Sequence, residues 1–381
     1  MTRNHEHLLR QAVHDLADEA LGPANLAEQA ISHGRRIRRR RQAGGALLTV
    51  VTLAAIAAPF LWLRPDPGAP FAGPTGPTAT AEATPSTSAS PDGKTGGGDW
   101  RSAPFPLPGG WIMTGATLQV TVKQASYVLD RAGGHYVAIE GYNEVWAPPS
   151  GDIVAVRDHD RQDETGLLNL RTDTVQWVRT GQPILTPQWS PDGSRLLLTI
   201  ASKQTGALSI GIITAADGSF RMYDVDGSRY LCTDWCQFTW QPDGREVSLA
   251  QTDPTAPRTE SAPHARRGLQ LFSADDGRPT RLLPIKGNVS GPTAWSPDGQ
   301  QVLVAGPQGP AVVEVETGRV AQNFPTKPHF AAQFAHWVAD NQLLWLDSQE
   351  DAVLTDIDGN ELERLPLPTE LASLTLSVAP A

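Results

Sequence analysis

Apolar and polar positions alternate along short stretches in the C-terminal part of the chain. One stretch places apolar side chains at Leu196, Leu198 and Ile200, and another places them at Val302 and Val304. A period of two residues is typical of β-strands that bury one face. The 35 glycines and 32 prolines among the 381 residues, both poor helix formers, also argue against a long helical protein. The pattern therefore predicts an all-β domain.

Five tryptophans recur in a shared context just before these stretches. Three lead into Pro-Asp-Gly: Trp189 with Pro191, Asp192 and Gly193, Trp240 with Pro242, Asp243 and Gly244, and Trp295 with Pro297, Asp298 and Gly299. Two degenerate copies begin at Trp146 and Trp337, and the successive tryptophans are 43, 51, 55 and 42 residues apart. Pro-Asp-Gly is typical of a tight turn, and a repeat of this length is typical of propellers and solenoids. We expect each tryptophan to end a strand and to fill the gap between neighbouring repeats.

A second hairpin accompanies the tryptophan hairpins, with Asp-Gly or Thr-Gly at the centre of most copies. The expected second hairpins occupy residues 127–140, 166–178, 208–225, 269–285, 311–322 and 352–367. Two hairpins in succession form a four-stranded antiparallel unit, which is one propeller blade.

The number of hairpins predicts the number of blades. The sequence has six second hairpins but only five tryptophan hairpins, so the sixth inner pair must come from residues 111–122 and 372–378. Pairing these two segments closes the ring and removes its open sheet edges. We therefore predict a single six-bladed β-propeller over residues 105–381, with seven blades as the main alternative.

The repeat resembles a known family. Trp-Ser-Pro-Asp-Gly followed by an apolar strand, as at residues 189–193 and 295–299, is similar to the WD40-like PD40 repeat of TolB-type β-propellers. The resemblance implies a propeller that binds proteins or peptides. It does not extend to the separate α/β domain of Gram-negative TolB, so a role in the Tol-Pal system is not implied. The layout also resembles membrane-anchored actinobacterial proteins, some of which look like partners of extracytoplasmic-function sigma factors.

Charge divides the N-terminal part of the chain into distinct segments. The whole chain has a net charge of −10, but residues 1–43 hold eight arginines and five acids, with six of the arginines in residues 35–41. Residues 44–63 contain no charge and are long enough to span a bilayer as a helix. The positive-inside rule then places residues 1–43 in the cytoplasm and the rest outside a plasma membrane crossed once. A cleaved signal peptide is the alternative to a retained anchor, since residues 55–57 are Ala-Ile-Ala, which has the small-x-small spacing of a signal-peptidase site.

The segments on either side of the anchor differ in composition. In the tail, Leu9, Val13 and Leu16 recur at helical spacing and predict a short helical cytoplasmic segment. Residues 64–104 are rich in Pro, Thr and Gly and predict a disordered stalk. The arginine run lacks interleaved aromatic residues and the chain is acidic overall, so we expect no nucleic-acid partner.

The two cysteines lie in the predicted extracytoplasmic part. Cys232 and Cys236 are four residues apart, and a local disulfide is the expected state outside the cell. This spacing is not that of the usual dithiol oxidoreductases, and no histidine lies near enough to complete a zinc site. We expect no metal and no cofactor.

Two long connections around the Trp240 hairpin are the candidate ligand face. Residues 226–237 and 251–268 should emerge on the same face of the propeller, and long, unequal loops on a regular scaffold often carry binding. A tolerated insertion is the alternative. The candidate ligand-contacting residues are Tyr230, Trp235, Arg258, His264, Arg266 and Arg267.

Evidence for catalysis in the sequence is weak. Residues 158–164 hold four acids and His159, but the calcium-loop pattern is missing, so a solvated loop is favoured. Paired carboxylates suit a glycosidase, yet any propeller contains many aspartates. No Gly-x-Ser-x-Gly or metalloprotease motif occurs, and His336, beside a repeat tryptophan, is expected to be buried for structural reasons. We predict no catalytic residue.

The predicted function is that of a non-enzymatic, membrane-anchored extracytoplasmic β-propeller. It would bind a protein, peptide or envelope ligand and could pass a signal to its cytoplasmic tail. One alternative is a membrane-bound regulator that holds a sigma factor through that tail, although residues 1–43 lack the cysteines of zinc-binding anti-sigma domains. The other is a propeller hydrolase or lyase with convergent ionisable residues in an axial pocket.

Overall fold

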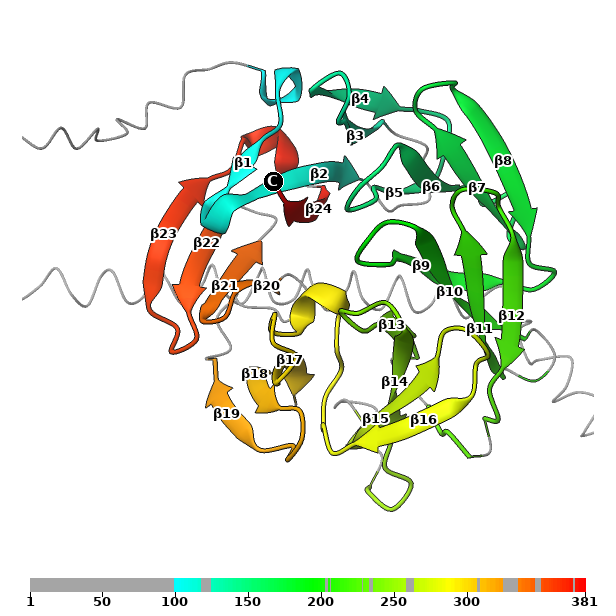
Figure 1. The fold of residues 1–381 in the computed structure, drawn as a ribbon, viewed down its shortest axis with the longest axis vertical. Coiled ribbons are helices and arrows are strands. Elements are labelled where there is room, and N and C mark those ends of the chain that lie inside the picture. Colours follow the sequence, from blue (N-terminus) through cyan, green and yellow to red (C-terminus); the bar gives the residue numbers. More distant parts are fainter. Residues whose placement is uncertain are drawn as a thin grey trace, which may run out of the picture. The chain divides into compact units, whose positions relative to one another are not determined.

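Six antiparallel sheets surround a common centre, as the blades of a propeller do (Figure 1). The structure is a computed structural model. It describes residues 99–117, 125–202, 205, 207–227, 229–232, 236–257, 264–306, 309–324, 335–346, 351–372 and 374–381. These residues belong to one compact unit, Asp92–Ala381. The six sheets confirm the predicted six-bladed propeller over the seven-bladed alternative.

The blades are numbered here in chain order, and within each the strands run from the centre outwards. Blade 1 holds β24 (Thr375–Pro380), β2 (Trp111–Thr117), β3 (Ser126–Asp130) and β4 (His135–Ile139), with the short β1 (Pro106–Leu107) also paired to β2. Blade 2 holds β5 (Glu144–Trp146), β6 (Ile153–Arg157), β7 (Glu164–Asn169) and β8 (Thr174–Arg179). Blade 3 holds β9 (Ile184–Trp189), β10 (Arg195–Ala201), β11 (Leu208–Thr214) and β12 (Phe220–Asp224).

The second half of the ring repeats this order. Blade 4 holds β13 (Thr239–Trp240), β14 (Glu246–Thr252), β15 (Arg266–Ser273) and β16 (Pro279–Leu283). Blade 5 holds β17 (Gln301–Gly306), β18 (Gly309–Glu314) and β19 (Val320–Asn323), and blade 6 holds β20 (Ala335–Ala339), β21 (Gln342–Leu346), β22 (Asp351–Asp356) and β23 (Glu361–Pro366). All six predicted second hairpins are present.

The ring is closed by pairing the two ends of the propeller, as expected. The C-terminal strand β24 runs antiparallel to β2, with Met113 opposite Val378 and Ala116 opposite Leu376. The predicted segments differ in their bounds. The C-terminal strand begins at Thr375, after the 3₁₀ turn Thr369–Leu371, and residues 118–124 lie outside the described residues.

Blade 5 departs from the expected four strands. Its innermost segment is reduced to two isolated bridges, Asn288 to Ala305 and Trp295 to Val302. Between them, Pro292–Ala294 forms a 3₁₀ turn. Pro292 has no N–H to donate to a ladder, and Gly291 before it has no side chain to pack, so a regular strand is interrupted here.

The repeat tryptophans occupy the predicted place between blades. Trp189, Trp240, Trp295 and Trp337 are buried, and Trp146 is half-buried. The Trp189 indole N–H donates to the Trp146 carbonyl at 2.9 Å, and that of Trp240 donates to the Gln188 carbonyl at 3.1 Å. Each of these two indoles therefore ties its inner strand to that of the preceding blade.

The packed domain begins before residue 105. Trp100 lies within the predicted stalk, residues 64–104, yet it is buried against the rings of Tyr127 and Tyr136, both at 5.3 Å between centroids. The Tyr136 hydroxyl donates to the Met113 carbonyl at 2.6 Å and accepts the Phe105 N–H at 3.0 Å. These contacts fix the entry of the chain onto blade 1.

The predictions for the N-terminal segments lie outside the described residues. They concern the cytoplasmic tail at residues 1–43, the anchor at residues 44–63 and most of the stalk. Within the ranges that are described, no helix is long and apolar enough to cross a membrane.

Candidate ligand-binding face

The meander of each blade divides its connections between two faces of the propeller. Turns between the first and second strands, and between the third and fourth, lie on one face, which we call the turn face. Connections between the second and third strands, and from one blade to the next, lie on the other, which we call the loop face. The Pro-Asp-Gly turns belong to the turn face, and the two long connections around Trp240 belong to the loop face.

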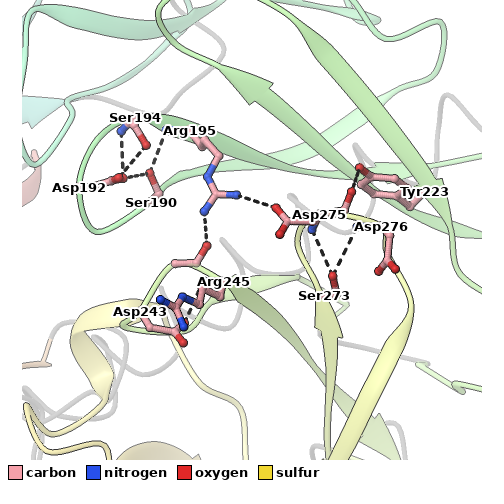
Figure 2. Close-up of polar contacts among 11 residues, drawn as sticks. Ser190, Asp192, Ser194, Arg195, Tyr223, Asp243, Arg245, Ser273, Asp275 and Asp276 are labelled. Carbon is pink, nitrogen blue, oxygen red and sulfur yellow. Dashed lines mark hydrogen bonds and ion pairs between the residues drawn. The ribbon is translucent and has the colours of Figure 1, made fainter.

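The turn face is built from tight turns whose polar groups bind one another (Figure 2). Asp192 accepts the Ser190 hydroxyl at 2.6 Å and the Ser194 hydroxyl at 2.7 Å, while Gly193 has a φ of 71°. Partial burial disfavours the charged carboxylate, but the serine hydrogen bonds outweigh it and hold the pKa of Asp192 below its usual value. Asp298 accepts the Ser296 hydroxyl in the same way. The Pro-Asp-Gly signature is therefore structural.

Arg195 extends this network from blade 3 to blade 4 (Figure 2). Its guanidinium donates to the Gly244 carbonyl, lies 3.7 Å from an Asp275 oxygen and sits 4.9 Å from the centre of the Trp240 ring. Asp243 accepts the Arg245 N–H at 2.9 Å in the neighbouring turn. The cation and its partners join two blades on the face opposite the candidate ligand face.

On the loop face, the connection from blade 3 runs beside the end of β14. The Thr252 N–H donates to the Leu231 carbonyl at 2.9 Å, and the Asp253 N–H donates to the Ala265 carbonyl at 2.8 Å. Cys232 and Cys236 form a disulfide with their Cα atoms 5.6 Å apart. The predicted cysteine pair therefore closes a small ring within the connection, next to the Leu231 carbonyl that pairs with β14.

A pocket of about 310 Å³ opens between blades 3 and 4 on this face. Its lining comes from the β10–β11 connection with the start of β11, from the connection between β12 and β13, and from β14. The lining residues are Thr205, Ala207, Leu208, Val225, Gly227, Tyr230, Leu231, Cys232 and Leu249. None carries a charge, and the pocket volume lies at the lower end of the range of about 300–1,000 Å³ for ligand pockets.

The residues predicted to contact a ligand differ in exposure and position. Tyr230 is only 8% exposed, lines the pocket and packs edge-on against Phe272 at 5.2 Å. Arg267 is exposed and His264 is half-buried. Arg266 is only 7% exposed and donates to the Thr252 hydroxyl at 3.0 Å, because the bulge between Gln251 and Thr252 turns it inwards. It is therefore not the surface contact that we predicted.

Two further candidates, Trp235 and Arg258, lie outside the described residues. The pocket itself was not predicted from the sequence. Tyr230 and Cys232 lie in one of the two long connections predicted to form the ligand face. Leu208, Val225 and Leu249 show no sequence pattern that distinguishes them from the other apolar residues of the blades. Only the packing of two blades brings these side chains together.

A second polar cluster lies on the loop face of blade 2, at the start of the inner strand β5. Glu144 binds His159 Nε2 at 2.8 Å and Arg157 Nη1 at 3.4 Å, and the His159 N–H donates to the Asn143 side chain at 2.8 Å. Arg157 is nearly buried, whereas the His159 side chain is 37% exposed. The sequence indicates His159 only as a member of the acidic segment at residues 158–164, and its pairing with Glu144 was not predicted.

The acidic segment at residues 158–164 binds arginines. Glu164 accepts hydrogen bonds from Arg161 at 2.8 Å and from Arg179 at 3.1 Å, and these cations hold the pKa of its carboxyl below the usual value. In the ranges that the structure describes, no group of three or more His, Cys, Asp or Glu side chains is placed to hold a metal ion.

His336 lies on the inner strand β20, between two blades. Its Nδ1 is 2.8 Å from the Thr293 hydroxyl, and its ring centre is 6.0 Å from that of Trp111. His336 is half-buried, and packing around its ring removes enough water to lower the pKa of this imidazole to about 4, so it is neutral at physiological pH. Its contacts are those of a structural residue.

No model of a known protein family matches this chain. No curated protein matches it either. Among solved structures, TolB from Acinetobacter baumannii is similar with a TM-score of 0.45 and 15% identity, over 70% of this chain and 64% of that one. The dihydro-heme d1 dehydrogenase NirN, solved in complex with DHE, has a TM-score of 0.42 and 15% identity, over 70% and 56%. The acylaminoacyl peptidase of Pyrococcus horikoshii has 0.45 and 12%, over 67% and 44%.

Each of these solved structures is similar to this chain with a TM-score below 0.5. The chain spans less than two thirds of the length of each of these three structures. At this level of identity and TM-score the comparisons carry no argument about activity.

Proposed function

We propose that this chain is a membrane-anchored extracytoplasmic propeller that binds a protein or peptide on its loop face, between blades 3 and 4. The observation that carries the proposal is the pocket of about 310 Å³ at that position. One wall is the connection that contains the Cys232–Cys236 disulfide and is hydrogen-bonded to β14 through Leu231 and Thr252. A binding module needs a concave, pre-formed surface, and this site supplies one.

The chemistry of the pocket favours binding over catalysis. General acid–base catalysis needs an ionisable side chain beside the reacting group. The described lining of the pocket contains no Asp, Glu, His, Lys or Arg side chain, and its cysteine, Cys232, is held in a disulfide. Tyr230 is packed against Phe272, so its ring serves as a wall.

Membrane anchoring is supported by the sequence. Residues 44–63 carry no charge, and the arginine cluster at residues 35–41 precedes them. With this orientation the propeller lies outside the cytoplasm and residues 1–43 lie inside, where they are available to a cytoplasmic partner. A disulfide in the propeller is consistent with an oxidising compartment.

The anchor is tested by fractionation of cells that make the full-length chain. We expect the chain to stay in the membrane pellet after an alkaline wash, and a variant lacking residues 44–63 to be released. Protease added outside the cells should remove a C-terminal epitope and spare an N-terminal one. Release of the full-length chain by the wash would contradict the proposal.

Ligand binding is tested by panning a displayed random-peptide library on the full-length chain in detergent. We expect saturable peptides whose binding weakens about ten-fold or more in Thr205→Trp, because Thr205 lines the pocket and is exposed. The control is Thr172→Trp, at another exposed threonine, in the β7–β8 turn on the turn face. Failure to enrich any peptide, or equal losses in the two variants, would refute a ligand site on the loop face.

A further inference from the structure

We propose that the pocket between blades 3 and 4 takes one uncharged apolar side chain, aliphatic or aromatic, of a peptide or protein partner. The inference rests on the proposed function and specifies the chemistry of that site. It follows from three properties of the pocket: a pre-formed apolar floor, a polar rim and the absence of charge among the described lining residues.

The floor of the pocket is part of the core. Val225, Tyr230 and Leu249 are buried and belong to the cluster that fills the space between blades 3 and 4, and Leu208 packs against the same cluster. The Tyr230 ring is fixed by Phe272 at 5.2 Å and by the Arg229 guanidinium at 5.7 Å. Side chains held in this way cannot easily move to fill the space, so the pocket is present before a ligand arrives.

The rim offers hydrogen bonds to a peptide backbone. Thr205 is exposed at the mouth, and its hydroxyl accepts the Ala207 N–H at 3.2 Å. That hydroxyl keeps its own proton, which it can donate to a carbonyl of the partner. An apolar floor with a polar mouth suits a side chain that enters the pocket while its backbone stays at the surface.

The lining selects against charge. A Lys or Asp side chain placed among Leu208, Val225 and Leu249 would lose its hydration and find no counter-ion in the described lining. The volume of about 310 Å³ lies at the lower end of the range for ligand sites and has room for an aliphatic or an aromatic side chain. Such a side chain matches the chemistry of the lining.

The test measures binding of blocked amino acids to the full-length chain by saturation-transfer NMR. The probes are the N-acetyl amides of leucine, phenylalanine, lysine and aspartate, with free toluene as an apolar molecule that lacks a backbone. We expect saturable binding of the leucine and phenylalanine probes, at least ten-fold weaker binding of the charged probes, and weaker binding of toluene than of the phenylalanine probe.

Two variants fill the pocket from different walls. Ala207→Phe acts from the half-buried rim, and Gly227→Phe acts from a position where an added Cβ meets no atom within 4 Å. Both should abolish binding of the leucine and phenylalanine probes without lowering Tm. Ala132→Phe, at an exposed site in the β3–β4 turn on the opposite face, should leave binding unchanged.

The outcomes separate this inference from the proposed function. Absent or charge-indifferent binding of the probes, or binding that survives in both folded variants, overturns the inference. If peptides from the library still bind on the loop face in that case, the proposed function holds and only the inference about an apolar side chain is wrong. Toluene binding as tightly as the phenylalanine probe also overturns it, because the site would then take a free apolar molecule. Loss of both peptide and probe binding refutes the two together.

Discussion

The structural role of a single residue in this propeller can be predicted from the sequence where the backbone conformation requires that residue type. Gly193, Gly244 and Gly299 have φ values of 71°, 65° and 70°, which few residues other than glycine adopt, so the Pro-Asp-Gly signature predicts both the turn and its conformation. By contrast, the Gln188 amide accepts the Trp240 N–H and donates to the Ser290 carbonyl across three blades. No local pattern marks such a contact, because its partners are distant in the sequence.

The aspartates of the repeat turns should differ in their contribution to stability. Asp192→Ala removes the acceptor of two serine hydroxyls and of the Ser194 N–H, and we expect a loss of about 1–2 kcal/mol in the free energy of unfolding. Asp243→Ala should cost less, because Gln241 stands where Ser190 stands in the other turn. Urea unfolding of the two variants measures the difference. Equal losses would show that the serine contacts contribute nothing.

His336 should make stability depend on pH. Its pKa is lowered by burial from the ordinary 6.5 to about 4, so the unfolded chain binds a proton between these values and the folded chain does not. The free energy of unfolding therefore falls as the pH drops from 6.5 to 4. His336→Gln, which keeps a partner for Thr293, should flatten Tm across this window.

The matched control for this effect is His135→Gln, at an exposed position on the outer strand β4. It makes the same chemical replacement at the surface, away from Thr293 and Trp111. The acidic residues with lowered pKa values, such as Asp192 and Asp298, lose their contribution only at lower pH, below their ordinary 3.8. An unaltered profile in His336→Gln would contradict the assignment.

At the scale of elements, the hairpins and their order can be predicted from the sequence, whereas the interrupted inner strand of blade 5 and the pocket between blades 3 and 4 cannot. Alternating apolar residues predict all six outer hairpins, and Asp-Gly or Thr-Gly centres support four of them, because both signals are local. The inner strand of blade 5 is lost at Gly291 and Pro292, and the pocket arises where two blades meet. These features depend on packing between elements, so the two long connections predicted only the region of the site.

The disulfide should stabilise the loop-face connection by a modest amount. It closes a ring between residues four apart, for which the chain-entropy account gives about 2 kcal/mol. We expect the double variant C232S/C236S to lose about this much stability in urea unfolding and to show faster amide exchange at residues 229–232. Unchanged exchange there would mean that the Thr252 and Leu231 pairing alone holds the connection.

The whole molecule is a closed ring on a chain of uneven charge. The overall net charge of −10 combines an N-terminal segment with an excess of three positive charges and a more acidic remainder. The six blades were predictable because the repeat is regular, and closure followed from counting hairpins against tryptophans. Ligand identity does not follow from a repeat, because the same scaffold supports different loops.

Ring closure makes the C-terminal strand essential for stability. Removing residues 375–381 takes away β24, including the buried Val378 and Ala379, and leaves the edge of β2 unpaired. We expect Tm to fall by at least about 10 °C, since each kcal/mol shifts Tm by roughly 2–4 °C in a domain of this size. Removing Ala381 alone is the control. A cooperative transition at unchanged Tm in the longer deletion would contradict closure through this strand.

The central claim is that the ligand binds on the loop face between blades 3 and 4, and site-specific photo-cross-linking in cells tests it most directly. A benzophenone amino acid is placed in the full-length chain either at Thr205, beside the pocket, or at Thr172 on the turn face. We predict a discrete protein or peptide adduct from position 205 and none from position 172. An adduct from position 172 alone, or from neither position, would contradict the claim.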